Sequence, residues 1–230
     1  MKYVVTTVLA TLVGFIALIP HAGATTPSTV VLFDGVSLDG WRGRDDLWSI
    51  EEGSIVGRTS EDDPIDANTF LVSDIPVAGD FELSFQYKIE SGNSGVQYLS
   101  TVKDETRFIV GGYQADIDST GRFTGILYEE KGRGILATRG QSVTISEEGK
   151  KAVETFSSAD DLAQGIHDGQ WNDYRIAVTG DRREHYINGA LMSAVTDMQT
   201  KKAASKGVIA LQLHRGPAMT VRFRNLILRK

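Results

Sequence analysis

The chain of 230 residues contains no cysteine. This absence excludes disulfide bonds, thiolate metal sites and cysteine nucleophiles, so the stability of the fold must come from packing alone. Internal repeats, low-complexity segments and linkers are also lacking. Beyond its N-terminal segment the chain is therefore expected to form one domain, large enough to bury a substantial core.

The chain also lacks an excess of positive charge. The chain has 24 Lys and Arg against 30 Asp and Glu, a net charge of −6 at pH 7. Lys2 is the only one of these charged residues in the first 24, so the remainder carries −7. An acidic surface of this kind argues against nucleic acids and anionic membranes as partners.

The chain also lacks an apolar run long enough for a membrane span. Residues 4–19 are mostly apolar, but three threonines interrupt them, and a spanning helix needs roughly 20 apolar residues. Small residues at 22–24 follow, a pattern typical of a signal-peptide cleavage site. We therefore predict a signal peptide over residues 1–24, cleavage after Ala24, and export of a single domain, residues 25–230, to the periplasm or the medium. No stable membrane anchor is expected.

What is present is a period of two. "FELSFQYKI" (81–89) alternates apolar and polar residues, and further short β-rich runs follow, separated by turns rich in Gly, Asn and Asp. This pattern predicts an all-β sandwich or jelly roll of antiparallel sheets. One short surface helix is expected within "SSADDLAQGI" (157–166), with Ser158 as its cap and Asp161 three residues on. The polar stretch 146–161 is otherwise expected to be a loop.

The stretch "GGYQADID" (111–118) carries polar residues at alternate positions of a predicted strand. Alternate residues lie on one face, about 6.6 Å apart at about 3.3 Å per residue. The same alternation in the neighbouring runs predicts that their polar residues share a common face. In this prediction Leu99 lies on the same face as Gln97. The side chains assigned to this face are those of Gln97, Gln114, Asp116, Glu129, Gln212 and His214.

Two interpretations of this face remain open: the solvated face of an ordinary sheet, or the wall of a cleft that binds sugar hydroxyls through amides and carboxylates. Asp118, before Ser-Thr-Gly, is typical of a turn residue that binds its own backbone. Asp116 and His214, ionisable and mid-strand, favour the cleft. His185 is assigned to the surface of a strand. A divalent cation has oxygen and imidazole ligands available but no compact ligand spacing, so no metal or other cofactor is predicted.

Seven motifs carry a resemblance that spans residues 32–228. They are "LFDGVSLDGW", "SGNSGVQY", "GGYQADID", "TGILYEEKGRGIL", "GQWNDYRI", "YINGALMS" and "GVIALQLHRGPAMTVRFRNLIL". In this order they resemble the DUF1080 family, the 3-keto-disaccharide hydrolase domain. The resemblance implies a concanavalin A-like jelly roll and an exported protein acting on oxidised sugars. Two positions differ from many members, which carry Glu in place of Gln114 and Arg in place of Leu99.

The carboxylate pattern bears on the chemistry. Jelly-roll β-glucanases carry Glu-x-Asp-x-Glu on one strand face, whereas "QADID" has an amide at the nucleophile position. A retaining glycosidase needs two working carboxyl groups about 5 to 5.5 Å apart, so an ordinary β-glucanase is disfavoured. A ketone at C3 acidifies the proton at C2, so one base can start an elimination that releases the C1 oxygen without a nucleophile.

The predicted function is cleavage of the glycosidic bond of 3-keto-sugars, with a small carbohydrate as the partner. The alternative is a non-catalytic carbohydrate-binding or cell-surface interaction module, because jelly rolls serve lectins as readily as hydrolases. Asp116 or His214 is assigned as the base and Glu129 as the acid partner. The residues assigned to substrate binding are Gln97, Tyr113, Gln114, Arg133 and Gln212.

Overall fold

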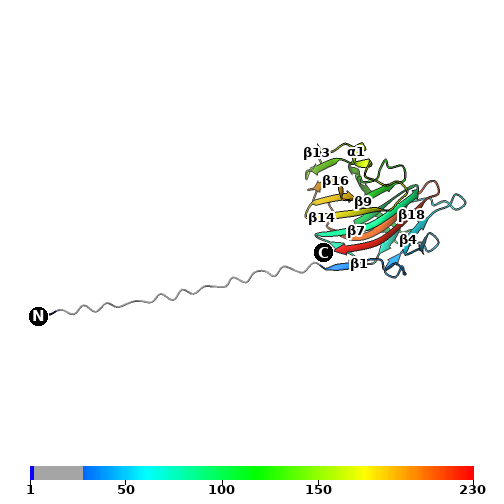
Figure 1. Ribbon diagram of the computed structural model, residues 1–230, viewed down its shortest axis with the longest axis horizontal. Coiled ribbons are helices and arrows are strands. Elements are labelled where there is room, and N and C mark those ends of the chain that lie inside the picture. The colour runs from blue at the N-terminus through cyan, green and yellow to red at the C-terminus, as the bar shows by residue number, and fades with distance from the viewer. Residues whose placement is uncertain (3–27) are drawn as a thin grey trace.

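A computed structural model describes residues 1–2 and 28–230 as two β-sheets packed face to face (Figure 1). The predicted cleavage point after Ala24, and the signal segment apart from its first two residues, lie outside the described residues. Within the described part, no helix is both long enough and apolar enough to cross a membrane. The sheets follow the all-β prediction from the two-residue period.

One sheet has ten strands and the other has eight. The ten-stranded sheet consists of β1 (Thr29–Val31), β3 (Trp48–Glu51), β4 (Ser54–Arg58), β7 (Phe81–Ser91), β12 (Gln141–Ile145), β13 (Lys151–Thr155), β14 (Asn172–Thr179), β15 (Arg182–Ile187), β16 (Ala190–Asp197) and β18 (Thr220–Arg229). The eight-stranded sheet consists of β2 (Trp41–Arg42), β5 (Thr69–Ser73), β6 (Val77–Ala78), β8 (Asn93–Asp104), β9 (Ile109–Asp118), β10 (Leu127–Glu130), β11 (Gly134–Ala137) and β17 (Lys206–Leu213). The order across its main path is β11-β10-β9-β8-β17-β5-β2.

Strand β7 shows why these sequences form a sandwich. Its apolar residues at odd positions from Phe81 to Ile89 are buried, and the polar residues between them are partly exposed. The same alternation in β14 and β15 turns one face of the ten-stranded sheet inward. There it packs against Val96, Ala115 and Leu211 of the other sheet, within one continuous core. Apolar area removed from water, worth about 25 cal/mol per Å², holds the layers together.

Two local features differ from the sequence-based predictions, and a third agrees with them. Strand β12 runs parallel to β16, so the ten-stranded sheet is not purely antiparallel. The stretch predicted as a loop contains β13, which pairs with β12 although all five of its residues are exposed. Helix α1 (Ala159–Ala163) is capped as expected, with the Asp161 amide donating to the Ser158 hydroxyl at 3.0 Å. The loop prediction failed because the pairing of β13 is set by β12 and not by a buried face of its own.

Charged side chains join the two sheets at one end of the sandwich. Arg133, in the turn after β10, donates to the Glu129 carboxylate at 2.5 Å and to Asp197 Oδ2 of β16 at 2.6 Å. The Tyr113 hydroxyl also donates to Asp197 Oδ2, at 2.5 Å. Burial of Asp197 opposes its ionisation, but the bonds from Arg133 and Tyr113 prevail and its pKa is lowered. These four residues are hereafter the inter-sheet cluster.

The inter-sheet cluster corrects three assignments. Glu129 was assigned to catalysis, and Tyr113 and Arg133 to substrate binding, yet all three are engaged between the sheets. The cause is register: Glu129 lies opposite Tyr113, whose ring is in the core, so both side chains lie on the inner face of the eight-stranded sheet. Strand parity within "TGILYEE" does not reveal which of its two faces is the inner one.

We expect Arg133→Met to destabilise the fold, because it leaves the fully buried Asp197 carboxylate without its cation. The free energy of unfolding in urea should fall by about 3 kcal/mol at pH 7, the lower end for breaking a buried ion pair. Because the pKa of Asp197 is lowered in the folded state, its contribution is present above the unfolded value near 4 and lost below it. The difference between variant and wild type should therefore shrink as the pH falls.

Arg44→Met is the matched control, since Arg44 pairs with Asp46 on the surface, where both side chains are more than a third exposed. Exposed pairs contribute about 0–1 kcal/mol. Equal losses of stability in the two variants would contradict a structural role for the inter-sheet cluster.

Candidate functional site

A cavity of about 390 Å³ opens on the outer face of the eight-stranded sheet, the face that points away from the ten-stranded sheet. Its floor comes from alternate residues of β9, whose other residues, Tyr113, Ala115 and Ile117, are in the core. Gln114 and Asp116 therefore face the cavity. Strand β17 brings Gln212 to it, and His214 follows directly after that strand. Four of the eight predicted site residues thus line one cavity.

The floor is a network of amides and one carboxyl group. Gln97 Nε2 donates to Gln114 Oε1 at 2.9 Å, and Gln114 exchanges two longer bonds, 3.2 and 3.3 Å, with the Gln212 amide. Gln114 Nε2 also donates to Asp116 Oδ1 at 2.5 Å. Gln97 is fully buried and does not line the cavity, so it supports Gln114 and does not itself face a ligand. The network gives the Asp116 carboxyl group one fixed orientation.

A glycine makes room for this network. Gly95 lies opposite Asp116 in the β8–β9 pair. A Cβ at Gly95 would come within 2.7 to 2.8 Å of Gln114 Cγ, Cδ and Nε2, closer than real Cβ contacts. The Gln114 side chain therefore lies over the backbone of β8, and any larger residue at position 95 would displace it from Asp116.

The environment of Asp116 changes its acidity. The residue is 6% exposed, and this burial raises the pKa of its carboxyl group to about 7. The hydrogen bond from Gln114 opposes the rise, and the negative charges of Glu130 and Asp118 add to it. A carboxyl group with this pKa is half ionised near neutral pH, which is the condition for an effective general base.

The cavity rim includes residues that sequence reasoning did not select. Tyr128 lies opposite Gln114, and Glu130 lies opposite Gly112, so these two side chains occupy the face once assigned to Glu129. The Glu130 carboxylate accepts from Asn68 Nδ2 at 3.3 Å and lies 3.8 Å from Lys131 Nζ. The alternation in "LYEE" already places Tyr128 and Glu130 on one face. The register against β9 was needed to show that this face lines the cavity.

Asp118 reaches the cavity but has a local structural task. Its carboxylate accepts from the Thr120 amide and hydroxyl, at 3.2 and 2.7 Å, and from the Phe123 amide at 3.2 Å. This arrangement is the turn predicted from Asp-Ser-Thr-Gly. It fixes the loop between β9 and β10 against the rim.

Leu99 and His185 are placed differently from their predictions. A β-bulge after Tyr98 gives Leu99 a positive φ of 49° and turns its side chain into the core, so it does not share the face of Gln97. His185 is fully buried, not on the surface, with Nε2 2.9 Å from the Tyr98 hydroxyl and Nδ1 3.3 Å from the Ile126 carbonyl oxygen. This burial lowers the pKa of His185 to about 3, so the ring is neutral at physiological pH.

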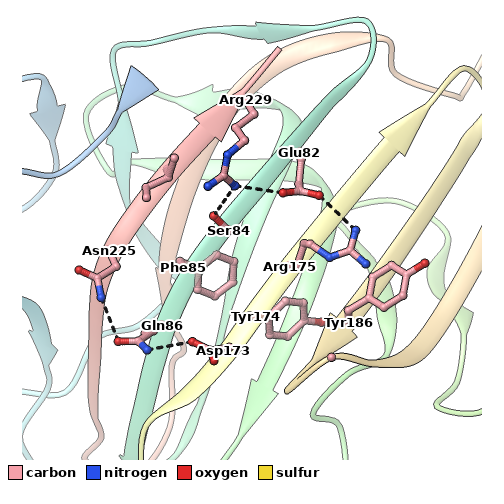
Figure 2. A pocket seen from close by; sticks show the side chains of 12 residues that line it. Glu82, Ser84, Phe85, Gln86, Asp173, Tyr174, Arg175, Tyr186, Asn225 and Arg229 are labelled. Carbon is pink, nitrogen blue, oxygen red and sulfur yellow. Dashed lines mark hydrogen bonds and ion pairs between the residues drawn. The ribbon is translucent and has the colours of Figure 1, made fainter. Parts of the chain in front are cut away.

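A second hollow of similar volume, about 400 Å³, lies on the outer face of the ten-stranded sheet (Figure 2). Its charged side chains pair with one another: Glu82 accepts from Arg175 at 3.2 Å and from Arg229 at 3.1 Å. Asp173 accepts from Gln86 Nε2 at 2.8 Å. These charged groups are at least partly exposed and satisfy each other, and burial raises the pKa of Tyr174, the buried ionisable residue of this hollow, so its hydroxyl stays protonated. We therefore place the candidate site at the cavity around Asp116.

Among residues 28–230, no three His, Asp or Glu side chains are grouped so that they could hold an ion.

Comparison with known proteins identifies the class of domain. The family model for the 3-keto-alpha-glucoside-1,2-lyase-like domain matches residues 28–229. No curated protein matches the chain.

Solved structures share the fold. A putative glycosyl hydrolase from Parabacteroides distasonis is 18% identical with a TM-score of 0.57, covering 88% of this chain and 99% of that one. The carbohydrate-binding module CBM66 from Bacillus subtilis is 16% identical with a TM-score of 0.53, covering 81% and 93%. A Bacillus licheniformis β-glucanase is 11% identical with a TM-score of 0.51, covering 91% and 99%. At these identities the likeness concerns the fold alone, which is of the concanavalin-like sandwich type.

The raised pKa of Asp116 should appear in the pH dependence of stability. Its folded-state value is above its unfolded value, so its favourable contribution is complete below pH 4 and is lost as the pH rises through about 7. Asp116→Asn keeps an acceptor for Gln114 but cannot ionise. At pH 8.5 the variant should be more stable than the wild type, by on the order of a few kcal/mol. Thermal unfolding from pH 4 to 8.5 measures the difference, and a constant offset would contradict the assignment.

Proposed function

We propose that this chain, which belongs to the 3-keto-alpha-glucoside-1,2-lyase-like family, cleaves the glycosidic bond of 3-keto-glycosides by elimination in the cavity around Asp116. The observation that carries the proposal is the buried carboxyl group of Asp116, with a pKa of about 7, on a floor of glutamine amides. Amides recognise sugar hydroxyls because each offers a donor and an acceptor in one plane. The cavity volume is within the range of about 300–1,000 Å³ typical of small-molecule sites.

The reaction needs one base at C2 of the sugar. The ketone at C3 makes the C2 proton acidic, and its removal leaves an enolate. As the enolate collapses, the bond between C1 and the glycosidic oxygen breaks, and that oxygen takes up a proton to leave as an alcohol. The products are the alcohol and a sugar with a double bond between C1 and C2 in conjugation with the ketone. Addition of water across this double bond then gives the free 3-keto-sugar.

Asp116 is the base in this scheme. Its carboxylate oxygen Oδ1 is held by Gln114, and its pKa of about 7 gives a basicity that an exposed aspartate lacks. His214, at the rim beyond β17, is a further ionisable residue of the cavity and is the candidate for donating a hydrogen bond to the enolate oxygen at C3. Gln114 and Gln212 orient the hydroxyl groups.

Ordinary glycoside hydrolysis fits the cavity less well. A retaining or inverting glycosidase needs two carboxyl groups in working positions, about 5–5.5 Å or 6.5–9.5 Å apart. Asp118 is engaged in its turn. Glu130 accepts a hydrogen bond from Asn68 and lies opposite Gly112, which is four residues before Asp116 on β9. Elimination requires no second carboxylate.

A non-catalytic carbohydrate-binding module is the second candidate. The fold is shared with a carbohydrate-binding module, and the amide network alone would hold a sugar. Binding a sugar does not require a carboxyl group whose burial raises its pKa to about 7, whereas general-base catalysis at neutral pH does. This difference in use makes the enzyme the first candidate.

Asp116→Asn should lower kcat for a 3-keto-disaccharide by about 10² to 10⁴-fold, the range expected for loss of a general base, with KM little changed. In the wild type, kcat/KM should rise with pH through about 7, because only the ionised carboxylate accepts the C2 proton. Substrate recovered part-way from deuterated water should carry deuterium at C2 where proton removal is reversible.

Asp173→Asn is the matched control, because it makes the same chemical change on the outer face of the other sheet. It should leave kcat unchanged. Cleavage of the unoxidised disaccharide at an equal rate would refute the elimination, since its C2 proton is not acidic. Binding of the 3-keto-sugar without turnover would favour the binding module.

A further inference from the structure

Apolar side chains around the cavity are confined to one side of it in the order of the strands. On the side of β8 and β17 the cavity is polar, with Asn93, Gln212 and His214. On the side of β10, β11 and the loop before β10, apolar side chains lie beside the polar residues Thr120, Arg122 and Glu130. The apolar side chains there are Phe123, Ile126, Tyr128 and Ile135, which we call the apolar wall. Asp116 lies between the two sides, on β9.

The backbone fixes the apolar wall in place. Tyr128 and Ile135 are register partners in the β10–β11 pair, so their side chains are neighbours on the cavity face. Lys151 Nζ donates to the Ile135 and Leu136 carbonyl oxygens, at 2.7 and 3.2 Å, and ties the edge strand β11 to β13. Phe123 is held through its amide by Asp118. The wall is therefore preformed.

Ile135 is 41% exposed although it borders a buried carboxyl group. The Arg122 guanidinium covers one face of the Phe123 ring, 4.9 Å from its centroid. Apolar surface left open at the rim of a small-molecule cavity gains free energy only when an apolar ligand group covers it.

The polar and apolar sides face different parts of a glycoside. The sugar ring, with its hydroxyls and C3 ketone, needs the donors and acceptors of Gln114, Gln212 and His214. With its C2 proton at Asp116, the bond to the leaving group extends toward the opposite side. A second hexose seated against Phe123, Tyr128 and Ile135 would turn the hydroxyls of that face toward apolar side chains, which is unfavourable. Arg122 and Glu130 on the same side offer partners only to its other hydroxyls.

We propose that the leaving group is an apolar ring, such as a phenol, seated against Phe123, Tyr128 and Ile135, and that the substrate class is 3-keto-glycosides with apolar ring aglycones. This inference rests on the proposed function for the reaction, but the preference is a binding property of the apolar wall. A phenol also leaves more readily than a sugar alcohol, because its pKa is near 10, like that of tyrosine. Departure of a phenolate therefore needs little help from an acid on that side.

The test uses three 3-keto-glucosides that differ only in the leaving group: phenyl, cyclohexyl and glucosyl. Cyclohexanol is apolar but as weak an acid as a sugar alcohol, so it separates contact with the wall from leaving-group acidity. Dissociation constants are measured by calorimetry on Asp116→Asn, where no turnover interferes, and kcat/KM is measured on the wild type. We expect the phenyl and cyclohexyl compounds to bind about tenfold more tightly than the glucosyl compound.

Ile135→Ser, made in both the wild type and Asp116→Asn, should remove most of this preference while leaving the affinity for the glucosyl compound within about twofold. Val153→Ser is the matched control, because Val153 is an exposed apolar residue of the edge strand β13, outside the cavity. It should change nothing.

The outcomes separate the two proposals. Equal or tighter binding of the glucosyl compound, or a preference that survives Ile135→Ser, would overturn the inference, even if all three compounds are cleaved. Tighter binding of the phenyl and cyclohexyl compounds with no cleavage by the wild type would support the apolar wall and refute the elimination.

Discussion

The hydrogen bond from Gln114 to Asp116 is the interaction on which the site depends. Burial alone would hold the carboxyl group protonated, and this one charge-assisted donor limits the rise of its pKa to about 7. Gln114 is in turn fixed by Gln97 and Gln212, and it has room only because residue 95 is a glycine. A glutamate at position 114 would place a second carboxylate beside Asp116 and raise its pKa further.

The two faces of the eight-stranded sheet have different roles, since the inner face forms the core and the outer face carries the cavity. The inner face packs into the core and carries the inter-sheet cluster, whose Arg133 and Asp197 join β10 to β16 across the sandwich. Because Glu129 and Glu130 are consecutive, holding Glu129 on the inner face holds Glu130 at the cavity. The charged cluster therefore supports the geometry of a site that it does not touch.

The lining of the cavity differs between its two sides. Gln212 lies on the side of β17, the apolar wall lies on the side of β10, β11 and the loop before β10, and Asp116 lies between them on β9. In the proposed reaction, the two halves of the glycoside contact different surfaces of the cavity. It also gives Asp118 a task beyond its own turn, since its bond to the Phe123 amide holds part of the apolar wall.

Local sequence patterns determined the fold class and much of the cavity floor. The two-residue period placed Gln114 and Asp116 on one face of β9, and the turn chemistry of Asp118 and the cap of α1 follow from residues within a few positions of each other. Alternation states which residues share a face, but not which face is turned inward. That choice depends on register between strands, and it moved Glu129 into the inter-sheet cluster and Glu130 and Tyr128 to the cavity. The bulge at Leu99, the burial of His185 and the pKa of Asp116 likewise depend on segments distant in sequence, because desolvation and pairing arise only when the sheets pack.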